Sequence, residues 1–143
     1  MIPAFVFAAS LASTFLDDFT GTWLCGEQKT VWNIQPWRDR WAQVTYGDPE
    51  HPYGVAYVGF LEADNVISYN DFHADGALAR LTSPPPTNHI YHWSGAYYPL
   101  GKPKDTSGDI YWTLTPSGTL HRDFGQIVDG KRKALAADEC VKQ

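Results

Sequence analysis

The chain is poor in cysteine and in basic residues. Its 143 residues include only two cysteines, Cys25 and Cys140, and neither has a second cysteine nearby to form a metal-binding or redox pair. Lys and Arg number 11 against 16 Asp and Glu, and apart from Lys131–Lys133 they are scattered. Because binding to a phosphate backbone requires a basic face, the composition argues against a nucleic-acid partner.

Long hydrophobic runs are also missing beyond the first residues. Ile2–Ala12 is apolar and uncharged and ends in the small residues Ser10-Leu11-Ala12, the layout of a signal peptide with its cleavage site. We therefore interpret residues 1–12 as a signal peptide and residues 13–143 as one mature domain, secreted or periplasmic. The absence of Lys or Arg before the run leaves a buried N-terminal strand or helix as the alternative. No other stretch approaches the about 20 apolar residues of a membrane helix.

The composition indicates a folded β-protein. Apolar residues make up 43% of the chain and charged residues 19%, which excludes a disordered tail. Aromatic residues reach 15%, and aromatic side chains favour strands. Sustained helical periodicity is absent, and the length fits a single domain.

Turn signals divide the chain into short strand-like segments. Asp75-Gly76 and Asp129-Gly130 are typical of tight two-residue hairpins, and Pro116-Ser117-Gly118 is a third turn. Residues 15–19 are predicted to form a short helical turn or plug, and 133–142, although alanine-rich, is assigned to a strand because it follows a hairpin. The predicted strands are 21–28, 30–37, 41–46, 54–62, 66–73, 77–83, 89–98, 109–115, 119–128 and 131–141. We predict an all-β fold, an antiparallel up-and-down barrel of 8–10 strands.

The cysteines support closure of that barrel. In an oxidising compartment, a disulfide between Cys25 and Cys140 is the default expectation. Such a bond makes the first and last strands neighbours, as closure of a sheet into a barrel does.

Gly21-Thr22-Trp23, at the start of the first predicted strand, resembles the Gly-x-Trp opening of lipocalins and of the wider calycin superfamily, which includes avidins and fatty-acid-binding proteins. The resemblance implies a ligand-binding barrel in which Trp23 caps one end and a basic residue from a late strand, Arg122 or Arg132, packs across it.

The hairpin turns predict which side chains face each other. With Asp75-Gly76 as a two-residue loop, His73 opposes Leu78 and Asp71 opposes Arg80, so that Tyr69, Asp71, His73 and Arg80 share one face. A carboxylate beside an imidazole can orient it for acid–base chemistry. An ordinary cross-strand ion pair is the alternative interpretation.

The second hairpin gives a register for the last two strands. With Asp129-Gly130 as the loop, Val128 opposes Lys131, His121 opposes Asp138 and Thr119 opposes Cys140.

Histidines elsewhere do not predict a metal site. His89 and His92 are three apart, so in a strand they point to opposite faces and cannot chelate one ion. A single axial His or Tyr91 for haem is a weaker alternative. We expect no metal and no cofactor.

Six Trp and eight Tyr exceed what a small core can pack without placing some of them at a pocket. The leading hypothesis is an exported barrel that binds a small hydrophobic or aromatic molecule in its interior. One alternative is a cofactor-free lyase, isomerase or hydrolase with His73 as base, Asp71 as its orienting group and Tyr69 as donor. Another is an envelope interaction protein with a filled barrel. The predicted ligand-binding residues are Trp32, Tyr57, Tyr69, His73, Arg80, Trp93 and Trp112.

Overall fold

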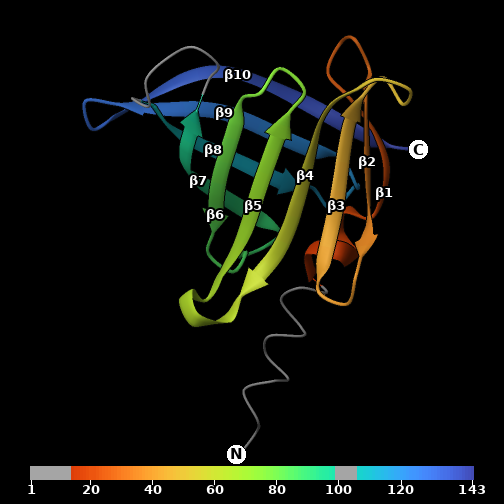
Figure 1. Ribbon diagram of the computed structural model, residues 1–143, viewed down its shortest axis with the longest axis horizontal. Coiled ribbons are helices and arrows are strands. Elements are labelled where there is room, and N and C mark those ends of the chain that lie inside the picture. Colours follow the sequence, from red (N-terminus) through yellow and green to blue (C-terminus); the bar gives the residue numbers. More distant parts are fainter. Residues whose placement is uncertain (1–13, 99–105) are drawn as a thin grey trace, which may run out of the picture.

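The computed structural model describes residues 14–98 and 106–143. They form one closed barrel of ten antiparallel strands, in which each strand pairs with the next along the chain and β10 returns to β1 (Figure 1). This confirms the predicted up-and-down barrel. The strands are β1 (Gly21–Cys25), β2 (Thr30–Trp37), β3 (Trp41–Gly47), β4 (Pro52–Leu61), β5 (Val66–His73), β6 (Leu78–Ser83), β7 (Ile90–Tyr98), β8 (Thr106–Leu114), β9 (Leu120–Val128) and β10 (Lys131–Lys142).

Strand placement follows the turn signals closely. β2 and β5 have the predicted bounds, and the alanine-rich end of the chain is strand, as predicted. The largest differences are at β1, which ends earlier, and at β8, which begins earlier than predicted.

The disulfide joins the two strands that close the barrel. Cys25 and Cys140 are register partners on β1 and β10, their Cα atoms lie 4.0 Å apart, and their sulfurs are bonded. Both residues are buried. The predicted pairing is confirmed. Residues 1–12, predicted as a signal peptide, lie outside the described residues.

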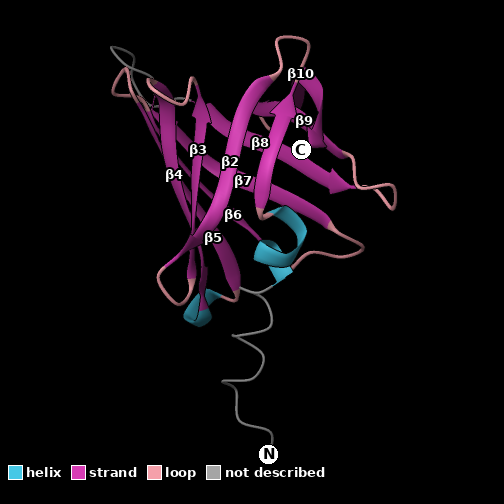
Figure 2. Cartoon of the chain, turned by 90° about the vertical axis from the view of Figure 1, so that its right-hand side faces the viewer, coloured by secondary structure: helices cyan, strands magenta, loops and turns pink. Residues whose placement is uncertain are grey.

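A short helix at residues 14–19 closes one end of the barrel, the end that also carries the 3-10 turn η1 (Glu62–Asp64) (Figure 2). Phe15 and Phe19 are one helical turn apart, share a face and are buried. The Phe19 ring lies 4.9 Å from Tyr91 and 5.5 Å from Trp112, centroid to centroid. The predicted plug is therefore present, made of aromatic rings. No helix in the described part of the chain is long and apolar enough to cross a membrane.

The β5–β6 hairpin has a longer loop than predicted. Phe72 pairs with Leu78, so Asp71 lies opposite Ala79 and Arg80 opposite Asn70. The predicted Asp71–Arg80 pair is wrong. The Asp75 carboxylate accepts a hydrogen bond from the backbone N–H of Ala77, which produces a three-residue loop.

The β9–β10 hairpin begins as predicted and then shifts. Val128 pairs with Lys131 across a two-residue turn, which confirms that part of the register. A bulge between Ala134 and Ala136 then displaces the later pairs by one residue. The predicted His121–Asp138 and Thr119–Cys140 pairs are therefore wrong. The observed pairs are His121–Glu139, Arg122–Asp138 and Leu120–Cys140.

Candidate functional site

The barrel encloses a cavity of about 240 Å³ between the aromatic plug and the opposite end. Its wall is mostly apolar. Asp71, His73 and Tyr97 are polar members, and His73 and Tyr97 lie near the ends of β5 and β7 that point away from the helix. The lining residues are Trp32, Tyr69, Asp71, His73, Ala79, Leu81, Trp93, Tyr97, Ile110, Trp112 and Phe124.

Most of the residues predicted from the sequence share this cavity. Of the predicted binding residues, Tyr57 and Arg80 do not line it. Tyr57 faces outward, where its hydroxyl accepts a hydrogen bond from Gln43 Nε2 and its ring packs 4.9 Å from Trp37. Arg80 is exposed on the outer face of β6, because the longer hairpin loop reverses the predicted side of that strand.

Sequence reasoning missed other lining residues. Tyr97 lies four positions after Trp93 on β7, and Phe124 lies two positions after Arg122 on β9. Side chains alternate between the two faces of a strand, so residues an even number of positions from an inward-facing residue also face inward. Counting in this way along each strand could have found Tyr97 and Phe124 from the sequence.

Asp71 lies between Tyr46 and His73 at the cavity wall. The Tyr46 hydroxyl donates to Asp71, with Oη 3.0 Å from Oδ1, and His73 Nε2 lies 3.1 Å from Oδ2. The hydrogen bond with Asp71 raises the pKa of His73, against the opposing effect of partial burial. Burial and the neighbouring carboxylate raise the pKa of Tyr46, so its hydroxyl stays protonated and acts as a donor. The contacts form a hydrogen-bonded chain from Tyr46 through Asp71 to His73.

Gly54 makes room for this chain. It is buried on β4, where its register partners are Tyr46 on one side and His73 on the other. A Cβ atom at this position would overlap the Tyr46 hydroxyl. The absence of a side chain at Gly54 therefore lets Tyr46 reach Asp71.

Tyr69, Trp93 and Trp112 form an aromatic wall of the cavity. The Tyr69 ring lies 5.4 Å from Trp93 and 5.8 Å from Trp112, in edge-on contacts. Burial raises the pKa of Tyr69, so its hydroxyl also stays protonated. The Trp93 Nε1–H is buried without a hydrogen-bond partner among the residues that the structure describes.

No protein-family model matches the chain, and no curated protein matches its sequence.

Arg122 packs inside the barrel against rings of the cavity wall. Its guanidinium lies 4.3 Å from the centroid of the Trp32 ring and makes two hydrogen bonds to Asp138, of 2.8 and 2.6 Å.

The resemblance to lipocalins implied that Arg122 or Arg132 packs across Trp23, and this is wrong. The cation over Trp23 is Lys142, with Nζ 5.6 Å from the ring centroid.

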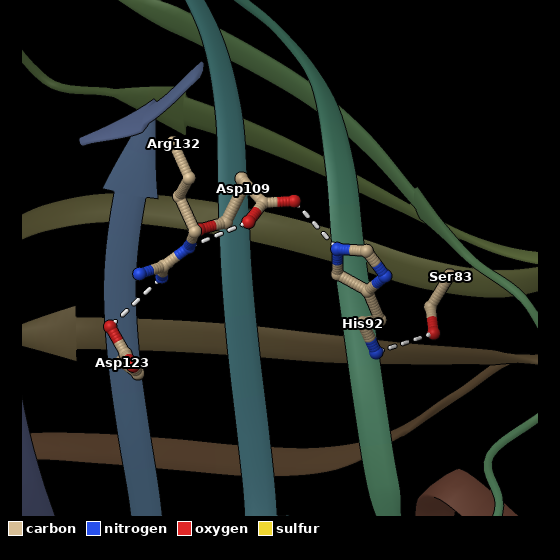
Figure 3. Close-up of polar contacts among 5 residues, drawn as sticks. All are labelled: Ser83, His92, Asp109, Asp123 and Arg132. Carbon is tan, nitrogen blue, oxygen red and sulfur yellow. Dashed lines mark hydrogen bonds and ion pairs between the residues drawn. The ribbon is translucent and has the colours of Figure 1, made fainter. Parts of the chain in front are cut away.

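A second polar network lies on the outer face of β7–β10 (Figure 3). Asp109 Oδ1 is 2.6 Å from His92 Nε2, and Asp109 Oδ2 accepts from Arg132 Nε at 2.7 Å. Arg132 also donates to Asp123, while Ser83 Oγ accepts from the backbone N–H of His92. Burial disfavours the charged form of Asp109, but the hydrogen bonds from His92 and Arg132 outweigh it and lower the pKa of Asp109. Because the side chains of His92, Asp109, Asp123 and Arg132 bond to one another away from the cavity, we infer that this network stabilises the fold.

His89, which the sequence analysis considered as a metal or haem ligand, contacts the N-terminal helix. His89 precedes β7, and its Nδ1 lies 2.9 Å from the Asp18 carboxylate, which also accepts from the Tyr91 hydroxyl. These hydrogen bonds hold the helix at residues 14–19 against the barrel. Within residues 14–98 and 106–143, no group of three or more His, Cys, Asp or Glu side chains is placed to hold a metal ion.

Two kinds of chemistry are open to the cavity. Its rings offer flat apolar contact area, and the phenol of Tyr69 carries a donor. His73, oriented by Asp71, adds a group able to accept or release a proton near neutral pH.

Proposed function

We propose that this protein binds a small aromatic or apolar molecule inside the barrel, and that it does so as an exported, calycin-like protein. The supporting observation is the apolar cavity of about 240 Å³ lined by Trp32, Trp93 and Trp112. A cavity of about 150 Å³ accommodates benzene. The larger volume here suits a ligand of about two fused rings.

The shape of the barrel supports a binding role over a purely structural one. A ten-stranded barrel filled by its own side chains would suit an interaction protein, but here the aromatic plug fills only one end and leaves the cavity above it. The disulfide between Cys25 and Cys140 fits an oxidising compartment, which supports export.

A cavity-filling variant tests this proposal. Ala79 lines the cavity, and Ala79→Phe should occupy the space of a ligand ring. Arg80→Phe places the same side chain on the outer face of the same strand and serves as the control. In calorimetric titrations with a panel of one- to three-ring aromatic compounds, the wild type and Arg80→Phe should bind at least one compound that Ala79→Phe does not. Equal binding by all three proteins, or no binding by the wild type, would contradict the proposal.

The chain of contacts from Tyr46 through Asp71 to His73 favours proton-transfer catalysis as a second candidate. A base at His73 would remove a proton from the carbon beside a carbonyl, and the enolate would recover a proton from water. In D₂O, the protein should speed deuterium uptake at C2 of 1-tetralone, measured by proton NMR, and His73→Gln should abolish the effect in a protein that remains folded. Exchange no faster than in buffer alone would remove this candidate.

A further inference from the structure

The last strand of the barrel has an edge that is left unpaired. β10 is 12 residues long, but only its final part, Cys140–Lys142, pairs with β1. The Glu139 carbonyl accepts one further hydrogen bond from the backbone N–H of Gly26, and the ladder on this side of β10 ends there. On this side the backbone of Lys131–Asp138 has no partner among residues 14–98 and 106–143, whereas its opposite side pairs with β9.

The unpaired segment also stands clear of the barrel. Every residue from Lys131 to Ala137 is exposed, so neither face of this part of β10 is covered. The β9–β10 hairpin extends past the ends of the neighbouring strands at the left of Figure 1. Leu135 is 56% exposed, and Val128 on the β9 side of the hairpin is 43% exposed. A bare strand edge beside exposed apolar side chains is a template for pairing with another chain.

The order of charges along this edge matches a second copy of the same strand. Residues 131–139 read Lys-Arg-Lys-Ala-Leu-Ala-Ala-Asp-Glu, with basic residues at one end, acidic residues at the other and an apolar centre. Two such strands can pair antiparallel about a two-fold axis beside Leu135. Lys131–Lys133 of each copy then lie alongside Asp138 and Glu139 of the other, and opposite charges across a strand pair attract.

Charges for this contact are available on the surface. Lys131 and Lys133 are exposed and make no ion pair with any described residue. The Glu139 side chain is 63% exposed, and its ion-pair partner among the described residues is the half-exposed His121.

The same edge discourages pairing with other strands. Lysines and β-bulges are devices that keep strand edges from aggregating, and β10 has both, with its bulge between Ala134 and Ala136. Lys131 and Lys133 repel a basic strand and find no partner on a neutral one. A copy of β10 supplies acidic partners, and its own bulge lies at the same place beside the axis. The edge is therefore selective for its own sequence.

We propose that the free edge of β10, residues 131–138, pairs antiparallel with the same edge of a second copy of this chain. The contact joins β9 and β10 of both copies into one continuous sheet and produces a symmetric homodimer. None of these residues lines the cavity, so the dimer is independent of the proposed binding function.

Charge reversal at the edge tests the proposal by analytical ultracentrifugation. The wild type should associate to a dimer as its concentration rises through the micromolar range. Lys133→Glu and Glu139→Lys each place like charges alongside one another at both ends of the symmetric contact, so each should raise the dimer Kd about tenfold. Arg80→Glu makes the same change in net charge as Lys133→Glu, on the outer face of β6, and should dimerise like the wild type.

Mixing the two weakened variants separates pairing of charges from damage to the strand. In an equimolar mixture of Lys133→Glu and Glu139→Lys, the two reversed side chains attract each other across the contact. The mixture should therefore form a heterodimer more tightly than either variant forms a homodimer.

The Ala137 amide gives a readout that needs no variant. Residues two apart on a strand present their backbone groups to the same side, so the Ala137 N–H faces the free edge as the Glu139 carbonyl does. Its exchange with D₂O should slow as the dimer forms. In dilute, monomeric protein, a peptide with the sequence of residues 131–139 should slow the same exchange, and a scrambled peptide of equal composition should not.

The opposite results would each overturn the proposal. They are a wild type that stays monomeric at the highest concentration, a dimer unaffected by both charge reversals, and weakened variants that do not recover on mixing. Equal protection of the Ala137 amide by both peptides would show an edge open to any extended partner, and protection by neither would exclude the edge as a docking site.

Discussion

The imidazole Nε2 of His73 lies 3.1 Å from Oδ2 of Asp71, and both side chains lie on the cavity side of β5. Residues two apart on a strand point the same way, so the backbone alone brings this pair together. Tyr46, from β3, holds the other side of the carboxylate.

The Asp71 carboxylate should control the titration of His73. Asp71→Asn removes the charge that holds the imidazolium, so the pKa of His73 should fall, as measured by NMR of the imidazole protons. Because the folded pKa is raised, the stabilisation from this pair is complete below about pH 6.5 and is lost as the pH rises through the folded pKa. The exposed His51, which has no such partner among the described residues, serves as the internal control. If the pKa of His73 were the same in Asp71→Asn as in the wild type, Asp71 would not be the cause of the raised pKa.

Gly54→Ala should disturb the contact between Tyr46 and Asp71. The added methyl group overlaps the Tyr46 hydroxyl, so we expect a loss of about 1–3 kcal/mol in the free energy of unfolding, measured with urea. Gly108→Ala is the control, because its Cβ would meet only Leu81 Cδ2 at 3.4 Å and the Gly95 carbonyl oxygen at 3.9 Å. A loss in Gly108→Ala as large as that in Gly54→Ala would show that the effect is general to strand glycines.

Replacing both cysteines by alanine should destabilise the barrel. The bond spans 115 residues of sequence, and the chain-entropy estimate for such a loop is about 5 kcal/mol. Urea unfolding of the double variant, compared with the oxidised and the reduced wild type, measures the loss. The reduced wild type should unfold at the same urea concentration as the double variant. If reduction left the free energy of unfolding unchanged, the disulfide would not stabilise the barrel.

Asp109→Asn should weaken the outer network and change the acid response. We expect a loss of about 1–3 kcal/mol at neutral pH, because charge-assisted hydrogen bonds from His92 and Arg132 are lost. The folded pKa of Asp109 is lowered, so its stabilisation is present above the ordinary pKa of 3.8 and disappears as the pH falls through the folded value. Urea unfolding between pH 7 and pH 3 should therefore show a shallower decline in the variant. A parallel decline would exclude Asp109 as a source of acid sensitivity.

The turn residues predict most of the fold because they act locally. Asp129-Gly130 takes positive φ at both positions, 50° and 74°, as a two-residue hairpin requires, and the first pair beyond it is correct. Asp75-Gly76 fails because the same dipeptide also fits a three-residue loop, and one added residue moves Arg80 to the opposite face. The bulge near Leu135 has no local signal, so the partners of His121 and Asp138 could not be deduced.

The site was predictable where alternation along one strand sufficed. Tyr69, Asp71 and His73 are on the same strand, and their common face follows from spacing alone. Tyr46 could not be found this way, because its contact with Asp71 depends on β3 lying beside β4 and on the space left at Gly54. The orphaned donor of Trp93 is a property of the packed interior, which no sequence pattern records.

The covalent link near the two ends of the chain also determines how the protein responds to proteases. Every hairpin loop from β2 to β9 lies between Cys25 and Cys140, so one cut in any of them leaves two fragments joined through sulfur. A nicked molecule would keep its strands aligned and migrate as one species on a gel until a reductant separates the pieces. The barrel should thus remain assembled after its first cleavage.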